Sequence, residues 1–339
     1  MNRRTLFTAA AGGLLLKPAA QAAALIKPKA LRAGDLVGMV TPSTQVADPD
    51  SLAAAEKMAQ YFGLRARFGK GVGKRGTYEQ SVQDRVADLH DMFRDPEVKA
   101  VFCIRGGYGA MQILDLLDYD LIRRNPKILL GYSDITSLHL AIHKKTGLVT
   151  FHGPVAVSRF TSYTQENFRK AIFDTKPIGT LTNPNAGDFR SPHPLRTVRP
   201  GKARGPLMPG NLSLVAALLG TPYEVDTRGK ILAIEDVGEQ AYSIDRMLTH
   251  LRLAGKLEQA AGVVWGECAD CGPFDYKPSF ATPYTVGETV DHLLKPLKVP
   301  VLAGLTFGHT SDQLTLPVGV MATLDADKGE LTIEESATV

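Results

Sequence analysis

A serine, a glutamate and a histidine stand at the ends of three apolar stretches of this sequence. Ser133 follows "KILLGY", Glu235 closes "KILAIE", and His309 follows "LAGLTFG". Nucleophilic acyl transfer uses these three groups, because an imidazole takes the proton of the attacking hydroxyl and a carboxylate orients the imidazole. The three residues therefore predict a hydrolytic site, provided that the fold brings them together.

Ser133 and Glu235 each have a second interpretation. Ser133 stands where a predicted strand stops and a helix begins, so it could cap the helix, for which serine is a favoured residue. At the same position its hydroxyl could be a nucleophile, with the next backbone N–H free to bind an oxyanion. The surroundings are not G-x-S-x-G, and Thr136 leaves a capping box incomplete. For Ser133, the local sequence favours the capping interpretation. For Glu235, the second interpretation is an ion pair at the strand end with an arginine such as Arg246.

The segment "RGGYGA", residues 105–110, follows another predicted strand. Its adjacent glycines, Gly106 and Gly107, let backbone amides approach a ligand without an intervening Cβ. Phosphate binding is an alternative use of such a loop. However, the third glycine of a dinucleotide fingerprint is missing, and "GKGVGKRGT" at residues 69–77 lacks the Walker spacing. Both nucleotide interpretations are therefore disfavoured.

Two other pairs of residues have spacings that metal sites use. His139 and His143 lie four residues apart on a predicted helix, but Leu140 stands where the H-E-x-x-H motif has its glutamate. Cys268 and Cys271 have no second pair to complete a zinc site, so we expect free thiols or a disulfide. The sequence thus predicts neither a metal nor an organic cofactor.

The elements that would position these residues form two groups. Apolar strands alternate with helical stretches across residues 30–157, which predicts a parallel sheet covered on both faces. Residues 158–201 are rich in Pro, Asn, Thr, Ser and Arg, which predicts a linker. A second domain at residues 202–336 continues with strands and helices and ends in an alternating, antiparallel pattern. In open parallel sheets, ligands bind beyond the carboxyl ends of the strands, where Ser133 is predicted to lie.

The amino-terminal segment differs from the rest of the chain. Residues 1–22 combine Arg3 and Arg4 with an apolar stretch and a small-residue "AQA", as in a twin-arginine export signal. Cleavage after Ala22 would lower the formal net charge from +4 to +1, so a nucleic-acid surface has no electrostatic support. No internal apolar run reaches the roughly 18 residues that span a bilayer. We therefore expect a periplasmic protein without a membrane span.

Six segments of the chain resemble the LD-carboxypeptidase family of serine peptidases, and they occur in the order found in that family. The family includes muramoyltetrapeptide carboxypeptidases and microcin-immunity peptidases. The resemblance extends over nearly the whole chain after the amino-terminal segment. The segments are "CIRGGYGAMQILDLLDYDLI", "LLGYSDITSLHLAI", "FHGP", "GNLSLVAALLGTPY", "ILAIEDVGEQAYSIDRML" and "LTFGHTSDQLTLPVG".

This resemblance implies a catalytic triad of Ser133, His309 and Glu235. It also implies an oxyanion hole made by the backbone N–H groups of Asp134 and Gly107. The fold it implies is α/β, with a flavodoxin-like or Rossmann-like parallel-sheet amino-terminal domain and a smaller, mixed carboxyl-terminal domain. Family members are often homodimers and need no cofactor.

The reaction implied is hydrolysis of an L–D peptide bond, which releases a terminal D-alanine from a murein tetrapeptide through an acyl-enzyme. By its position, Arg105 is a candidate for binding the substrate's terminal carboxylate. Two features depart from the family: residues 209–211 read "PGN" where G-G-N is common, and the family's known members act in the cytoplasm. The alternatives are an exported solute-binding protein for peptides or sugars, and a peptidase that inactivates a peptide antibiotic.

Overall fold

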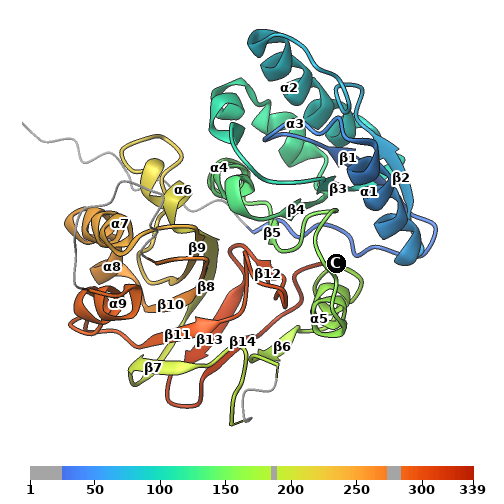
Figure 1. Cartoon of the computed structure of the whole chain (residues 1–339). Coiled ribbons are helices and arrows are strands. Elements are labelled where there is room, and N and C mark those ends of the chain that lie inside the picture. Colours follow the sequence, from blue (N-terminus) through green and yellow to red (C-terminus); the bar gives the residue numbers. More distant parts are fainter. Residues whose placement is uncertain (1–24, 185–188, 273–283) are drawn as a thin grey trace, which may run out of the picture.

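The structure is a computed structural model that describes residues 25–184, 189–272 and 284–339. The export signal predicted at residues 1–22 lies outside the described residues. The described chain forms two sheets with helices packed around them, one in the blue-to-green part of the chain and one in the yellow-to-red part (Figure 1). None of the helices in the described part of the chain has the length and apolar character of a membrane span.

The first sheet has six strands in the order β12-β5-β4-β3-β1-β2. The first five strands in the chain pair in parallel, as the sequence predicts. Their spatial order, 2-1-3-4-5, is that of flavodoxin-like sheets. The five parallel strands are β1 (Leu36–Val40), β2 (Arg65–Phe68), β3 (Val98–Cys103), β4 (Ile128–Gly131) and β5 (Phe151–His152). The central strands β1 and β4 are buried along their whole length, because helices cover both faces of the sheet.

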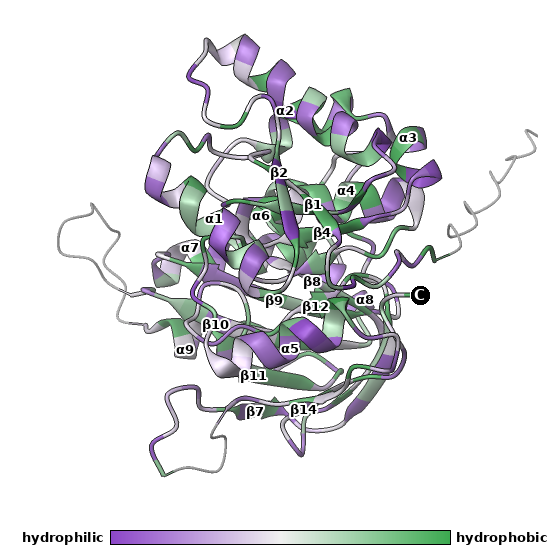
Figure 2. Cartoon of the chain, turned by 90° about the vertical axis from the view of Figure 1, so that its right-hand side faces the viewer, coloured by the Kyte–Doolittle hydropathy of each residue, from purple (hydrophilic) through white to green (hydrophobic). Residues whose placement is uncertain are grey.

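Helical segments connect these strands. Thr77 begins the second of them with a complete capping box, and Gly147 ends the last in a left-handed conformation. Figure 2 shows hydrophobic strands inside and hydrophilic residues along the outer helices, which agrees with the amphipathic patterns of the sequence. The helical segments are α1 (Pro49–Tyr61), α2 (Tyr78–Arg94), the 3₁₀ turn η1 (Ala110–Leu116), α3 (Tyr119–Arg124), the 3₁₀ turn η2 (Ser133–Ile135) and α4 (Thr136–Thr146).

The second sheet has eight strands in the order β6-β14-β13-β8-β9-β10-β11-β7. Its central strands β8 to β11 are parallel, and the predicted antiparallel pattern of the tail is the β13–β14 pair. The strands are β8 (Lys202–Asn211), β9 (Ile231–Val237), β10 (Gly262–Ala269), β11 (Val301–Leu305), β13 (Met321–Asp325) and β14 (Glu330–Ile333). The helices are α6 (Leu212–Ala217), α7 (Ala241–Leu253), α8 (Lys256–Gln259) and α9 (Val286–Leu294).

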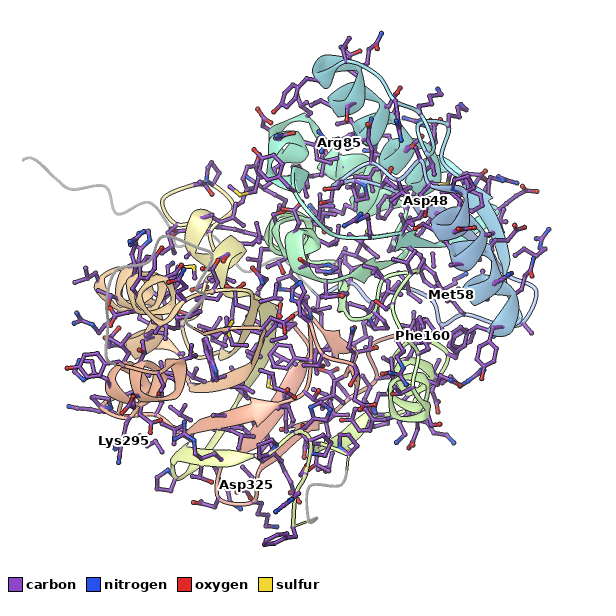
Figure 3. The ribbon with its side chains drawn as sticks, in the orientation of Figure 1. Asp48, Met58, Arg85, Phe160, Lys295 and Asp325 are labelled. Carbon is purple, nitrogen blue, oxygen red and sulfur yellow. A yellow bond between two sulfur atoms is a disulfide. The ribbon has the colours of Figure 1, made fainter. Side chains whose placement is uncertain are left out.

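The segment predicted as a linker, residues 158–201, contains regular structure. It forms α5 (Ser162–Ile172), β6 (Gly179–Leu181) and β7 (Arg196–Arg199), and both strands join the second sheet. Phe160 lies between α1 and α5, where its ring contacts Phe62 at a centroid distance of 5.3 Å (Figure 3). The polar composition of the segment hid this apolar contact, and the linker prediction did not include α5, β6 and β7.

One strand of the first sheet comes from the carboxyl-terminal part of the chain. This strand, β12 (Leu316–Pro317), pairs antiparallel with β5 and sets Leu316 opposite His152. The loop between β11 and β12 therefore starts in one sheet and ends in the other. Because His309 lies in this loop, its position depends on both sheets.

Candidate active site

Ser133 lies at a sharp turn directly after β4. Its backbone φ is 64°, and Asp270 is the one other non-glycine residue with a positive φ among those described. A left-handed conformation costs a residue with a Cβ on the order of 1–3 kcal/mol. The Ser133 side chain does not cap α4, whose cap residue, Ile135, makes no side-chain hydrogen bond. The capping interpretation was therefore wrong, and the turn presents the hydroxyl outside the helix.

The three residues singled out in the sequence are in contact. The His309 Nε2 atom lies 3.0 Å from the Ser133 Oγ, and the His309 Nδ1 lies 2.7 Å from the Glu235 Oε2. A carboxylate can only accept, so Nδ1 carries the proton and Nε2 is free to accept the serine proton. The predicted site residues Ser133, His309 and Glu235 thus form a continuous chain of hydrogen bonds.

Each member of this chain follows a strand end or lies close to one. Ser133 comes after β4, Glu235 lies on β9, and His309 comes after β11. Gly308, with φ of 82°, packs directly on the carboxyl group of Glu235, and a Cβ at this position would overlap that group. The left-handed φ and the close approach both require glycine here.

Glu235 is completely buried, and burial raises the pKa of its carboxyl group. The hydrogen bond from His309 acts in the opposite direction, because it stabilises the charged form. Arg246, the ion-pair partner considered for Glu235, instead stacks on the ring of Tyr242. The carboxylate of Glu235 is thus directed at the imidazole and not at an arginine.

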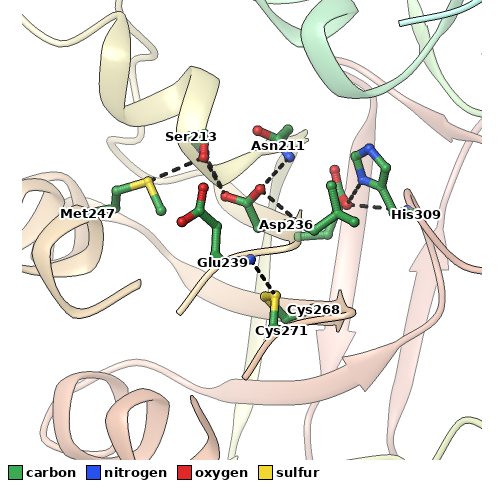
Figure 4. Close-up of a disulfide and its surroundings, with 10 residues drawn as sticks. Asn211, Ser213, Asp236, Glu239, Met247, Cys268, Cys271 and His309 are labelled. Carbon is green, nitrogen blue, oxygen red and sulfur yellow. Dashed lines mark hydrogen bonds and ion pairs between the residues drawn. A yellow bond between two sulfur atoms is a disulfide. The ribbon is translucent and has the colours of Figure 1, made fainter. Parts of the chain in front are cut away.

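The next residue, Asp236, anchors the end of β9 from the opposite face, because successive side chains of a strand alternate. Its carboxylate accepts hydrogen bonds from the Asn211 side chain at 2.9 Å and from the Ser213 backbone N–H at 3.0 Å (Figure 4). Asn211 also caps α6. The "PGN" segment therefore supports the strand that carries Glu235, a role that no local pattern in the sequence indicates.

The glycine loop lies beside Ser133. Gly106 packs so closely on Ser133 that an added Cβ would lie 2.9 Å from the serine Cβ. Gly107 has a φ of 118° and packs against Thr44, whose hydroxyl accepts the backbone N–H of Tyr108 at 2.9 Å. A side chain at either glycine would therefore overlap Ser133 or Thr44.

The side chain of Asp134 ties this loop to the turn. It is buried and accepts the Ala110 N–H at 2.8 Å and the hydroxyl proton of Ser43. The buried Arg85 holds the other side of the loop, since its guanidinium donates to the carbonyl of Gly109 at 2.9 Å. The sequence predicts a role for the backbone of Asp134 alone, because no local pattern indicates that its carboxylate closes the loop.

A cavity of about 310 Å³ opens beside Ser133 and His309. Arg105 lines this cavity and also an adjoining one of about 750 Å³, which extends over Arg75 and Tyr108. Together the two cavities form a cleft that ends at the serine hydroxyl. A cation at this position can meet an anionic group of a bound molecule.

The histidine and cysteine pairs form no metal site. His139 donates to the carbonyl of Gly131, and burial lowers the pKa values of His139 and His143 to about 4. Cys268 and Cys271 are joined in a disulfide (Figure 4). Among the described residues, no cluster of three or more His, Cys, Asp or Glu could hold a metal ion.

Known protein families match both halves of the chain. Residues 37–153 match the LD-carboxypeptidase N-terminal domain, and residues 204–324 match the LD-carboxypeptidase C-terminal domain. A probable murein peptide carboxypeptidase of Bacillus subtilis is 40% identical over 91% of this chain and 94% of its own length. The microcin C7 self-immunity protein MccF of Escherichia coli is 30% identical over 90% and 94%.

A solved structure agrees with these matches. The muramoyltetrapeptide carboxypeptidase of Oxalobacter formigenes superposes with a TM-score of 0.75 and 26% identity, over 89% of this chain and 98% of that one. The family matches and the structural likeness confirm the α/β fold and the family resemblance of the sequence. The chain belongs to the LD-carboxypeptidase family of serine peptidases.

Proposed function

We propose that this LD-carboxypeptidase removes the terminal D-alanine from murein tetrapeptides, with Ser133 as nucleophile, His309 as general base and Glu235 as orienting carboxylate. The observation that carries the proposal is the pair of contacts at 3.0 Å and 2.7 Å that join these side chains at the end of a cleft. The names of the relatives, which include a murein peptide carboxypeptidase, support this substrate class.

In the proposed reaction, His309 Nε2 takes the hydroxyl proton while Ser133 Oγ attacks the carbonyl carbon of the L–D peptide bond. The backbone N–H groups of Asp134 and Gly107 bind the resulting oxyanion, and each such donor contributes on the order of 100-fold to 1000-fold in rate. Arg105 pairs with the terminal carboxylate of the substrate.

The protonated His309 then gives its proton to the amino group of the leaving D-alanine, and an acyl-enzyme remains on Ser133. A water molecule, activated by the same imidazole, attacks the acyl carbon and releases the shortened peptide. Glu235 stabilises the imidazolium that forms in both halves of the reaction.

The test is incubation of the protein with L-Ala-γ-D-Glu-diaminopimelate-D-Ala, followed by mass spectrometry. We expect free D-alanine and a tripeptide. A tetrapeptide that binds but stays intact would contradict the proposal and favour a solute-binding protein. Faster cleavage of a peptidyl-nucleotide antibiotic in a parallel reaction would favour the alternative that the likeness to MccF suggests.

The substitution Gly308→Ala should lower kcat/KM about 100-fold, because the new Cβ displaces the Glu235 carboxylate and a shift of about 1 Å at a catalytic group costs this much. Gly220→Ala is the matched control. Gly220 has a similar φ of 78°, but an added Cβ would meet no described atom within 4 Å. Steady-state kinetics on the tetrapeptide should separate the two variants, and equal losses would attribute the effect to backbone strain alone.

We also propose that the chain is exported. The paired Arg3 and Arg4 and the disulfide between Cys268 and Cys271 support this, because disulfides persist in oxidising compartments. Cell fractionation should recover a chain that starts after Ala22 from the periplasm, and the double substitution Arg3→Lys, Arg4→Lys should retain it in the cytoplasm. An uncleaved cytoplasmic wild type would contradict export. The homodimer that the resemblance implies stays a prediction.

A further inference from the structure

The carboxylate of Glu235 is only half paired. Its Oε2 atom accepts from His309, whereas its Oε1 atom has no hydrogen-bond partner within the described part of the chain. His152 lies against this unpaired oxygen, with its Nε2 atom 3.8 Å from Oε1. Both ring nitrogens of His152 also lack a partner among the described residues, and both side chains have an exposed fraction of 0%.

The position of His152 is fixed by its surroundings. It lies on β5, paired to β4 on one side and to β12 on the other. Its ring packs against Tyr132 at a centroid distance of 6.3 Å and against Phe307 at 5.8 Å. These contacts hold the fully buried imidazole beside the Oε1 atom of Glu235.

The charge state of His152 suits a hydrogen-bond donor. Burial, followed by the neighbouring His139 and His309, lowers the pKa of His152 well below its usual value, so the ring is neutral and carries one N–H. A buried carboxylate oxygen without a donor is energetically unfavourable, because it has lost its hydrogen bonds to water without replacement. A neutral donor relieves this cost without cancelling the negative charge that His309 uses.

We propose that His152 is a positioning residue that donates its Nε2–H to the Glu235 Oε1 and so directs Oε2 at His309. An approach of about 1 Å brings the two atoms to hydrogen-bond distance. With both oxygens engaged, the carboxylate cannot rotate away from the imidazole when the proton arrives. This role rests on the proposed function, because His152 acts through Glu235.

The experiment compares His152→Phe, which removes the donor, with His152→Gln, which keeps an amide N–H close to the same position. Thr150→Val is the matched control, since Thr150 lies just before β5, is completely buried and also has an unpaired side-chain oxygen within the described residues. The readouts are kcat on the tetrapeptide and the rate at which a fluorophosphonate labels Ser133. In labelling, the serine oxygen bonds phosphorus, fluoride leaves, and His309 takes the proton.

We expect His152→Phe to lower both rates about 10–100-fold, as expected for a lost hydrogen bond to a charged group. His152→Gln should recover most of this loss, and Thr150→Val should stay within about twofold of wild type. In a Glu235→Gln background, His152→Phe should have little further effect, because the group through which it acts is already altered.

Equal losses from His152→Phe with and without Glu235→Gln would overturn the proposal and make His152 a packing residue. Wild-type rates in the Phe variant would do the same. If the Phe variant does not fold, His152→Gln against His152→Leu decides by the same comparison. A wild type that reacts with the fluorophosphonate but leaves the tetrapeptide intact would contradict the proposed substrate, while labelling would still test His152.

Discussion

Replacing Ser133 with alanine should reduce the release of D-alanine from the tetrapeptide on the order of 10⁶-fold, which is the loss seen when a triad nucleophile is removed. The reason is that Ser133 Oγ is the atom in contact with His309 Nε2, so no attacking oxygen remains in line with the base. A single-turnover assay with an excess of enzyme over tetrapeptide, followed by mass spectrometry, measures the residual rate.

The variant should keep its fold. Serine and alanine both carry a Cβ, so the cost of the left-handed φ of 64° is the same in both, and the contact between His309 and Glu235 does not depend on the hydroxyl. Ser133→Gly provides the control, because glycine adopts this φ without strain. It should be equally inactive and should unfold at a temperature no lower than that of the alanine variant. Turnover near the wild-type rate in either variant would remove Ser133 as the nucleophile.

Most of the first sheet could be predicted from the sequence because the runs that form β1, β3 and β4 are mainly apolar and alternate with helical patterns. Each run corresponds to a buried parallel strand, and the order of segments specifies right-handed crossovers. The segment at residues 158–201 was not predicted in the same way. Its helix α5 buries a few side chains, among them Phe168, within a polar composition typical of linkers.

The conformation of Ser133 could not be read from its neighbours. A cap and a nucleophile turn use the same residue at the same place, and the distinction is a backbone φ that tertiary contacts with Gly106 and the glycine loop impose. Glu235 and His309 could be selected because each closes an apolar run. Asp134 and His152 act through side chains whose partners lie in other elements, so no spacing in the chain marks them.

Glu235→Gln should lower kcat by a factor of about 10³–10⁴, as in triads whose carboxylate is replaced by an amide, and so retain more activity than Ser133→Ala. The amide has nearly the shape of the carboxylate, but it carries no charge to stabilise the imidazolium of His309. The attacking oxygen and the oxyanion donors remain. Kinetics of both variants on the same tetrapeptide provide the comparison, and turnover of Glu235→Gln near the wild-type rate would count against a role for the carboxylate.

Although Glu235→Gln should lower activity, it should raise the free energy of unfolding relative to the wild type at neutral pH. Burial raises the pKa of Glu235 in the folded protein above its ordinary value of 4.5. At a pH between 4.5 and this raised pKa, the folded protein binds more protons than the unfolded chain does. The free energy of unfolding of the wild type therefore falls as the pH rises through this window, because the buried carboxyl group must ionise in the folded state. A glutamine has no such ionisation.

Thermal unfolding of the two proteins at pH 4.5 and pH 8 tests this sign. The glutamine variant should gain stability relative to the wild type as the pH increases, even though it has lost most of its activity. If the wild type instead gains stability relative to the variant as the pH rises, the hydrogen bond from His309 has a larger effect on the pKa of Glu235 than burial has. The expected result means that the protein maintains a buried carboxylate at a cost in stability, and the loss of activity in the same variant gives the reason for keeping it.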